Sequence, residues 1–156
     1  MGFLKSKKGT IISDYFKLSK DVAQFKANNM YEVSLYDEYL ELAGIGGLSV
    51  KLKYEQITDV FYGLEKEVKE KNKSVIGRAV AGGLLFGGAG AVVGAISGTG
   101  KKQKTINRFM FIVSYKSQNG EDAFLTFEDT RLYKGSKLAS KLKELCKVEN
   151  ENVEFL

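Results

Sequence analysis

The stretch RFMFIVSYKSQNGEDAFLTF, residues 108 to 127, predicts a β-hairpin. Strand-forming residues run from Phe109 to Tyr115, polar residues follow at Gln118-Asn119-Gly120, and a second strand pattern runs from Ala123 to Phe127. Asn-Gly between two strand patterns is a strong hairpin signal, because these two residues accept the positive φ angles of a tight turn. This part of the chain is therefore expected to form two antiparallel strands.

Upstream of this hairpin, apolar and polar residues alternate with a period of two, which is typical of half-buried strands. Polar or glycine-rich turns, Tyr36-Asp37-Glu38 and Gly44-Ile45-Gly46-Gly47, separate the strand patterns. The predicted strands are residues 30–35, 39–43, 48–54 and 57–62. We expect these four short strands to form a meander.

Apolar residues recur at helical spacing near both ends of the chain. The pattern predicts an amphipathic helix over residues 13–27 and a second helix over about 132–147, with Leu138, Leu142 and Leu145 as its apolar stripe. The first helix either docks on the core or lies on a membrane surface. Lysines line another face of the second helix, which is either a solvated face or a binding surface.

A glycine-rich run, RAVAGGLLFGGAGAVVGAISGTGK, occupies residues 78–101, and no residue from Ala79 to Ser97 is charged. Its glycines recur at four-residue spacing, which on a helix makes a flat groove that a second helix can approach closely. The candidate helix-packing residues are Gly83, Gly87, Gly90, Gly94 and Gly98. Each interior glycine costs a helix about 1 kcal/mol relative to alanine. A helix in this run therefore needs stabilisation by contact with lipid, with a partner or with its own folded-back arm.

Composition excludes several classes of function. The chain has 156 residues and a net charge of +5, with no histidine and one cysteine, Cys146, so it offers no disulfide pair, no Cys/His zinc site and no histidine base. The phosphate-loop pattern fails, since Ala95 stands where its first glycine belongs and Lys102 replaces its hydroxyl residue. We expect no enzyme, no cofactor, no metal and no nucleic-acid partner. The lack of a secretory signal favours a cytoplasmic location.

Four segments together resemble the bacterial pleckstrin-homology-like (PH-like, GRAM-related) domains: VSLYDEYLELAG, LSVKLKYEQITDVFYG, RFMFIVSYKSQNGEDAFLTF and LASKLKEL. The resemblance implies a mainly β fold with helices (α+β), a bent β-sandwich or partly open barrel closed by a C-terminal helix. PH-like domains usually have seven strands, and the pattern predicts six. The missing strand is expected near residues 66–69 or in the N-terminal segment.

The sequence patterns and the resemblance together predict the domain organisation. Residues 1–29 form an N-terminal segment with the amphipathic helix, residues 30–148 form the PH-like domain, residues 66–106 form a glycine-rich hairpin inserted into it, and residues 149–156 form a tail. PH domains that bind phosphoinositides place cations around the first hairpin. Here that hairpin is predicted at Tyr36-Asp37-Glu38-Tyr39, which is acidic, so this mode of binding is not expected.

Topology constrains the glycine run. A single membrane-spanning helix would place the strands before and after the run on opposite sides of a bilayer, where they could not share one sandwich. We therefore expect a hairpin that turns near Gly88 and inserts into the bilayer. The residues predicted to contact lipid or a partner are Leu84, Leu85, Phe86, Val92, Val93 and Ile96. The residues predicted to contact anionic headgroups are Lys71, Lys73, Arg78, Lys101, Lys102 and Lys104.

Two functions are compatible with these features. One is a non-enzymatic module, peripheral to the inner face of the membrane, that inserts the hairpin and can self-associate through its glycines. The other is a soluble protein-interaction scaffold that uses the hairpin as an oligomerisation or partner-binding arm. The sequence identifies no particular protein partner.

Overall fold

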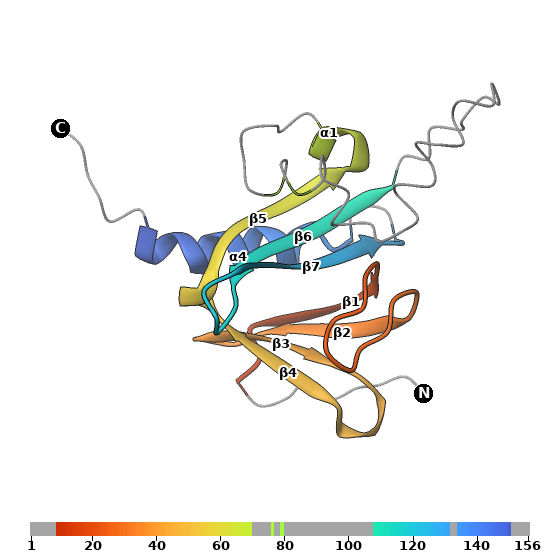
Figure 1. Cartoon of the computed structure of the whole chain (residues 1–156), viewed down its shortest axis with the longest axis horizontal. Helices are drawn as coiled ribbons and strands as arrows, with labels where there is room; N and C mark the ends of the chain where they lie inside the picture. The colour runs from red at the N-terminus through yellow and green to blue at the C-terminus, as the bar shows by residue number, and fades with distance from the viewer. Residues whose placement is uncertain (1–8, 70–75, 77–78, 80–107, 132–133, 151–156) are drawn as a thin grey trace.

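The computed structural model describes residues 9–69, 76, 79, 108–131 and 134–150, and in these ranges it contains seven strands and two α-helices (Figure 1). The strands are β1 Ile12–Leu18, β2 Met30–Leu35, β3 Tyr39–Ala43, β4 Ser49–Lys53, β5 Ile57–Leu64, β6 Phe109–Lys116 and β7 Asp122–Asp129. The helices are α1 Glu65–Lys69 and α4 Ser136–Asn150, and the two 3-10 turns are η1 Ile45–Gly47 and η2 Tyr54–Gln56.

All neighbouring strands are antiparallel, in the order β4-β3-β2-β1-β7-β6-β5. β1 joins the two halves of the sheet, but its ladder to β7 covers only two residue pairs, Lys17 with Glu128 and Leu18 with Phe127. The halves therefore diverge on either side of this short seam, as Figure 1 shows. β4 and β5 lie at the two edges, so the bent sheet is not closed.

The predicted helix over residues 13–27 is wrong. Its first part is the strand β1, in which Phe16 and Leu18 are fully buried and the residue between them is not. Farther along, Ala23 has a φ of 52°, which interrupts any helix. The period-two burial of β1 governs this segment because its main chain pairs with β2 and β7, and the helical spacing of apolar residues was coincidental.

The predicted four-strand meander is also partly wrong. β1 to β4 form the meander, whereas β5 leaves it after η2 and pairs with β6 along its length, from Ile57 with Tyr115 to Leu64 with Phe109. The seventh strand lies in the N-terminal segment, one of the two predicted places. The other place, residues 66–69, belongs to α1.

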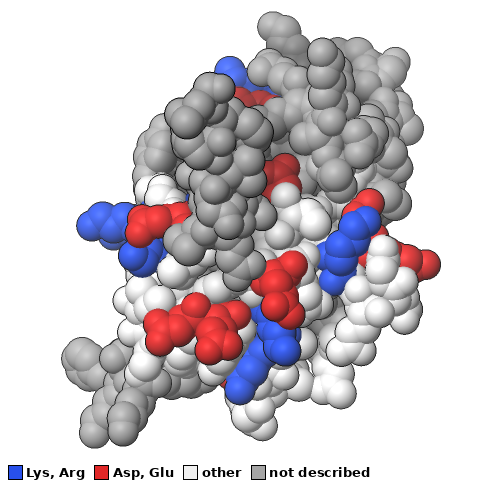
Figure 2. All heavy atoms as spheres, turned by 90° about the vertical axis from the view of Figure 1, so that its left-hand side faces the viewer, with Lys and Arg blue, Asp and Glu red and all other residues white. Residues whose placement is uncertain are grey.

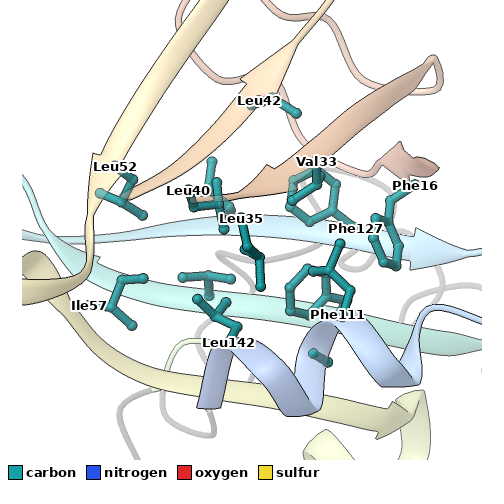
Figure 3. Close-up of a cluster of buried hydrophobic side chains, with 14 of the residues drawn as sticks. Phe16, Val33, Leu35, Leu40, Leu42, Leu52, Ile57, Phe111, Phe127 and Leu142 are labelled. Carbon is teal, nitrogen blue, oxygen red and sulfur yellow. The ribbon is translucent and has the colours of Figure 1, made fainter. Parts of the chain in front are cut away.

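The main core lies between the two halves of the sheet and α4 (Figure 3). The rings of Phe16, Phe111 and Phe127 meet at its centre, with centroids 4.9 to 5.7 Å apart. The predicted C-terminal helix is confirmed, and its Leu138 and Leu142 are fully buried in this core. These features agree with a PH-like β-sandwich in which a C-terminal helix packs into the bent sheet.

The β6–β7 hairpin is confirmed at the predicted turn. Gly120 has a φ of 81°, and its N–H donates to the Ser117 carbonyl at 2.9 Å. A residue with a side chain is strained at this angle, so glycine belongs at this position.

Candidate functional site at the root of the glycine-rich insertion

The predicted membrane, helix-packing and headgroup residues lie outside the described residues. The lipid or partner set is Leu84, Leu85, Phe86, Val92, Val93 and Ile96, and the glycine set is Gly83, Gly87, Gly90, Gly94 and Gly98. The basic set is Lys71, Lys73, Arg78, Lys101, Lys102 and Lys104. The structure does describe the place where this segment leaves the sheet and returns to it, which we call the insertion root: Leu64, Glu65, Arg108 and Phe109.

The two ends of the insertion root are held together directly. Leu64 and Phe109 are paired in the β5–β6 ladder, and the N–H of Glu65 donates to the carbonyl of Arg108 at 2.8 Å. The Arg108 guanidinium adds a two-pronged bond to the Glu65 carboxylate, with Nε to Oε1 at 3.0 Å and Nη2 to Oε2 at 3.3 Å. Such paired bonds fix orientation as well as distance. The chain therefore leaves and re-enters the sheet at one point.

Further charges connect the root to the seam of the sheet. Glu128 of β7 lies 4.0 Å from Arg108 Nη1 and 3.9 Å from Lys17 Nζ of β1. These pairs are partly exposed, so each contributes about 1 kcal/mol or less to stability. Their effect is mainly to orient the Arg108 side chain.

At the start of α1, the Glu67 side chain lies close to the main chain of Gly63 and Leu64. The Glu67 carboxylate folds back and accepts the N–H of Leu64 at 2.9 Å, which satisfies a main-chain donor at the beginning of the helix. A Cβ on Gly63 would lie 2.6 Å from this carboxylate oxygen. A larger residue at this position would displace the Glu67 carboxylate from its bond to the Leu64 N–H.

A second apolar cluster covers the outer face of β5 and β6. It contains Phe61 of β5, Met110 and Ile112 of β6, Val68 of α1, and Ile76 and Ala79 from the connection between β5 and β6; we call it the outer cluster. Ile76 is fully buried and Ala79 is 5% exposed. β6 is thus buried on both faces, and Ile76 just before the glycine-rich run and Ala79 at its start belong to the packed domain.

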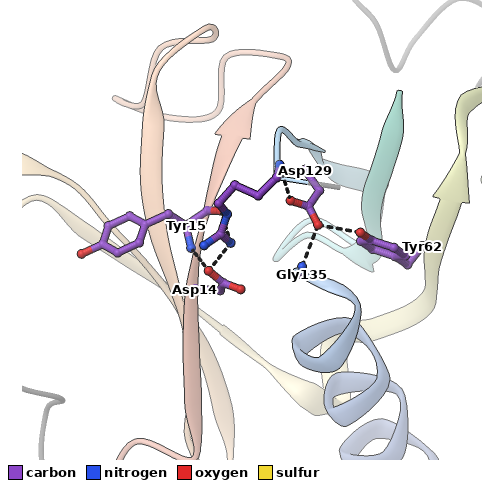
Figure 4. A network of polar contacts seen from close by, with 6 residues as sticks. Asp14, Tyr15, Tyr62, Asp129 and Gly135 are labelled. Atoms are coloured by element: carbon purple, nitrogen blue, oxygen red, sulfur yellow. Dashed lines mark hydrogen bonds and ion pairs between the residues drawn. The ribbon is translucent and has the colours of Figure 1, made fainter. Parts of the chain in front are cut away.

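A carboxylate next to the root ties α4 to the sheet (Figure 4). Asp129, which pairs with Phe109 in the β6–β7 ladder, is 2% exposed. Its Oδ2 accepts the Tyr62 hydroxyl at 2.5 Å and the Gly135 N–H at 2.7 Å, and its Oδ1 accepts the Arg131 N–H at 3.1 Å. This arrangement sets where α4 begins.

Arg131 extends the same network toward β1. Its Nη2 donates to the Asp14 carboxylate and to the Tyr15 carbonyl, the latter at 3.0 Å. The network joins β1, β5, β7 and the segment before α4, so the end of the sheet that carries the root is rigidly connected.

The first hairpin of the sheet is not the one that the sequence predicted. With β1 present, it is the β1–β2 connection, residues 19–29, and the acidic turn at 36–39 is the second. Lys26 in the first connection pairs with Asp21 at 3.7 Å. The acidic residues of this second turn therefore give no reason to expect or to exclude phosphoinositide binding at the first hairpin. On the face shown in Figure 2, basic and acidic side chains are interspersed.

The sequence analysis did not predict the Glu65–Arg108 ion pair or the outer cluster, although a sequence pattern points to each of them. Glu65 directly follows one strand and Arg108 directly precedes the next, and opposite charges at the two ends of an insertion favour contact. The unbroken apolar run from Phe109 to Val113 is typical of a strand buried on both faces.

No three His, Cys, Asp or Glu side chains of the described ranges are grouped so that they could hold a metal ion. Within the same ranges, no helix combines the length and the apolar character that crossing a bilayer requires.

Residues 18–128 match the model of a family described as glycine zipper containing PH domain, and this match covers more than half of the chain. The chain belongs to this family. The match confirms two predictions from the sequence, the PH-like domain and the glycine zipper. The relation to GRAM domains and the bacterial origin stay predictions. No curated protein matches the sequence. PH-like domains generally act as binding modules, which favours a non-enzymatic interaction or membrane-associated role for this glycine-zipper PH domain.

Proposed function

We propose that the protein is a non-enzymatic membrane-associating module whose glycine-rich segment enters the bilayer as a hairpin. The insertion root is the observation that carries this proposal. Because Leu64 pairs with Phe109 and Glu65 is clamped to Arg108, the segment between them has to return to the side that it left. A single crossing of the bilayer is incompatible with that geometry.

The length of the uncharged run suits a hairpin that enters one leaflet. Residues 79–97 would extend about 29 Å as one helix, which approaches the thickness of the hydrocarbon core. A turn at Gly87-Gly88-Ala89-Gly90 leaves arms of eight and seven residues, 79–86 and 91–97, which extend about 10 to 12 Å each if helical. The glycines then pack the arms together, and Leu84, Leu85, Phe86, Val92, Val93 and Ile96 contact the acyl chains.

Charge supports the same orientation. The basic residues flank both ends of the run: Lys71, Lys73 and Arg78 before it, and Lys101, Lys102 and Lys104 after it. Each basic residue near an anionic surface contributes about 1 kcal/mol of attraction. The domain accordingly lies at the inner face of the membrane, with both ends of the hairpin on the cytoplasmic side, and self-association through the glycines is compatible with this location.

The outer cluster supports a second candidate, a soluble interaction scaffold. Ile76 and Ala79 are buried against the domain's own sheet, so the start of the arm already packs on protein. If the rest of the arm behaves likewise, its glycines serve contact with a partner or with a second copy of the chain.

Vesicle flotation with the full chain separates the two candidates. Leu85→Asp with Phe86→Asp removes two apolar side chains, each of which gains about 2 kcal/mol on full burial, so binding weakens roughly a thousandfold. The matched control is Met30→Asp with Ile45→Asp, which makes the same change at two exposed apolar positions, one at the start of β2 and one in η1, 47% and 98% exposed. Binding should require anionic lipid and weaken with salt.

Flotation that survives the Leu85 and Phe86 substitutions refutes insertion of the hairpin. No flotation of the unaltered chain, together with a defined oligomer in detergent-free buffer, supports the scaffold. Circular dichroism of each variant establishes that the domain is still folded.

A further inference from the structure

The edge strand β4 presents main-chain groups that no described residue satisfies. The Gly44 N–H donates to the Leu48 carbonyl, and the Tyr54 N–H donates to the Glu38 carbonyl. These two bonds flank the β3–β4 ladder at its two ends. Antiparallel ladders alternate between hydrogen-bonded and non-bonded pairs. Between these two flanking bonds, Val50 and Leu52 are the residues of β4 that bond to β3.

The intervening residues, Ser49, Lys51 and Lys53, direct their N–H and C=O groups away from β3. The Lys53 N–H is satisfied by the Gln56 side chain at 3.1 Å. The N–H and C=O groups of Ser49 and Lys51 have no partner among the residues that the structure describes. Such an edge is a template for another extended segment.

The side chains of β4 specify what fits this edge. Lys51 and Lys53 are exposed on the outer face, and the Lys51 Nζ lies 4.8 Å from the centroid of the Tyr39 ring. Leu52 is 6% exposed and belongs to the main core, and the half-buried Val50 packs against it. The complementary strand has acidic side chains on one face and apolar side chains on the other.

The end of the chain has this pattern. Residues 151–156 read ENVEFL, in which Val153 and Phe155 alternate with Asn152 and Glu154. We propose that these residues add to the free edge of β4 as an antiparallel eighth strand. With Glu154 opposite Lys51, Val153 lies beside Leu52 and Phe155 beside Val50.

The end of α4 is well placed to deliver this segment. α4 contacts η2, which directly follows β4, and in Figure 1 the C-terminal end of α4 lies at the left, as does the start of β5 that follows η2. Cys146 of α4 and Tyr54 of η2 belong to the same buried cluster, so the last turns of α4 are adjacent to the end of β4. Six extended residues span about 20 Å, and β4 is about 17 Å long. A strand that starts near Lys53 runs antiparallel to β4.

Residues 1–8, MGFLKSKK, form a rival for the same edge, but they carry three lysines that would face Lys51 and Lys53. Like charges opposite each other destabilise a strand pair. The acidic segment is favoured for this reason.

Amide hydrogen exchange at Ser49 and Lys51, measured by NMR on the full chain, tests the proposal. Both amides should be protected, and a chain that stops at Asn150 should lose that protection by on the order of 10- to 100-fold. Glu154→Lys should weaken it, and Lys51→Glu added to Glu154→Lys should restore it. In this register Glu151 falls opposite Tyr54, beyond the end of β4, so Glu151→Lys makes the same charge change outside the ladder and should leave both amides protected.

Unprotected Ser49 and Lys51 amides in the full chain overturn the proposal. Protection that survives removal of residues 151–156 also overturns it, and assigns the edge to another segment such as residues 1–8. Protection that rises with protein concentration shows that a second copy supplies the strand, which contradicts pairing within one chain.

Discussion

The outer cluster leads to a quantitative prediction about Ile76. This side chain is fully buried against Phe61, Met110 and Ile112, outside the two strands that it covers. Truncating a fully buried isoleucine to alanine costs about 2 to 5 kcal/mol, and the lower half of that range applies here because the outer cluster is small. We expect Ile76→Ala to lower the free energy of unfolding by about 2 to 3 kcal/mol, and Tm by about 4 to 12 °C.

A double-mutant cycle isolates the contact itself. Ile76→Ala and Ile112→Ala belong to one cluster and should couple by about 0.5 kcal/mol or more. The matched control is Ile57→Ala, a core residue of β5 in the main cluster, whose effect should add to that of Ile76→Ala within about 0.5 kcal/mol. Urea unfolding followed by far-UV circular dichroism suits a chain that lacks tryptophan.

A loss of stability below about 0.5 kcal/mol for Ile76→Ala refutes the reasoning. That result would mean that the segment detaches from the sheet without unfolding the domain. Equal coupling of Ile76 to Ile112 and to Ile57 would refute it too, since the two partners lie on opposite faces of the sheet.

Three further predictions concern α4 and η2, and each is measured by denaturant unfolding. Gly135→Ala should cost several kcal/mol, because the new Cβ would lie 2.3 Å from the Phe16 ring and 2.8 Å from Asp129 Oδ2. Asp129→Asn should cost about 2 to 3 kcal/mol, because this buried carboxylate accepts three hydrogen bonds. Burial raises the pKa of Tyr54 above 10, so the folded state holds this proton more tightly and stability should fall as pH rises above about 10. Tyr54→Phe should make that fall shallower, while losing the bond to the Tyr36 carbonyl at 2.5 Å.

Specific outcomes contradict these three predictions. A Gly135→Ala variant as stable as the unaltered chain would show that α4 starts elsewhere. An Asp129→Asn variant that loses less than Asp21→Asn, a change at an exposed carboxylate, would show that the network does not hold α4. An unchanged pH slope in Tyr54→Phe would assign the alkaline loss of stability to the other tyrosines.

Local patterns predicted the strands whose burial alternates. The Asn119-Gly120 turn was predicted because its chemistry depends on adjacent residues alone. β1 was missed because Tyr15 and Leu18 also fit a helical spacing, and short apolar segments satisfy both periods. Which period applies depends on the neighbouring strands β2 and β7, which lie far along the chain.

The sequence by itself determined the uncharged glycine-rich run, its basic flanks and the need for both ends to share one sheet. Only the tertiary structure decided that β5 leaves the meander to pair with β6, that Glu65 clamps Arg108, and that Ile76 covers the outer face of the sheet. The physical reason is that turns and periodicity depend on neighbouring residues, whereas these contacts join residues tens of positions apart. Long-range contacts form only when the whole sheet brings their partners together.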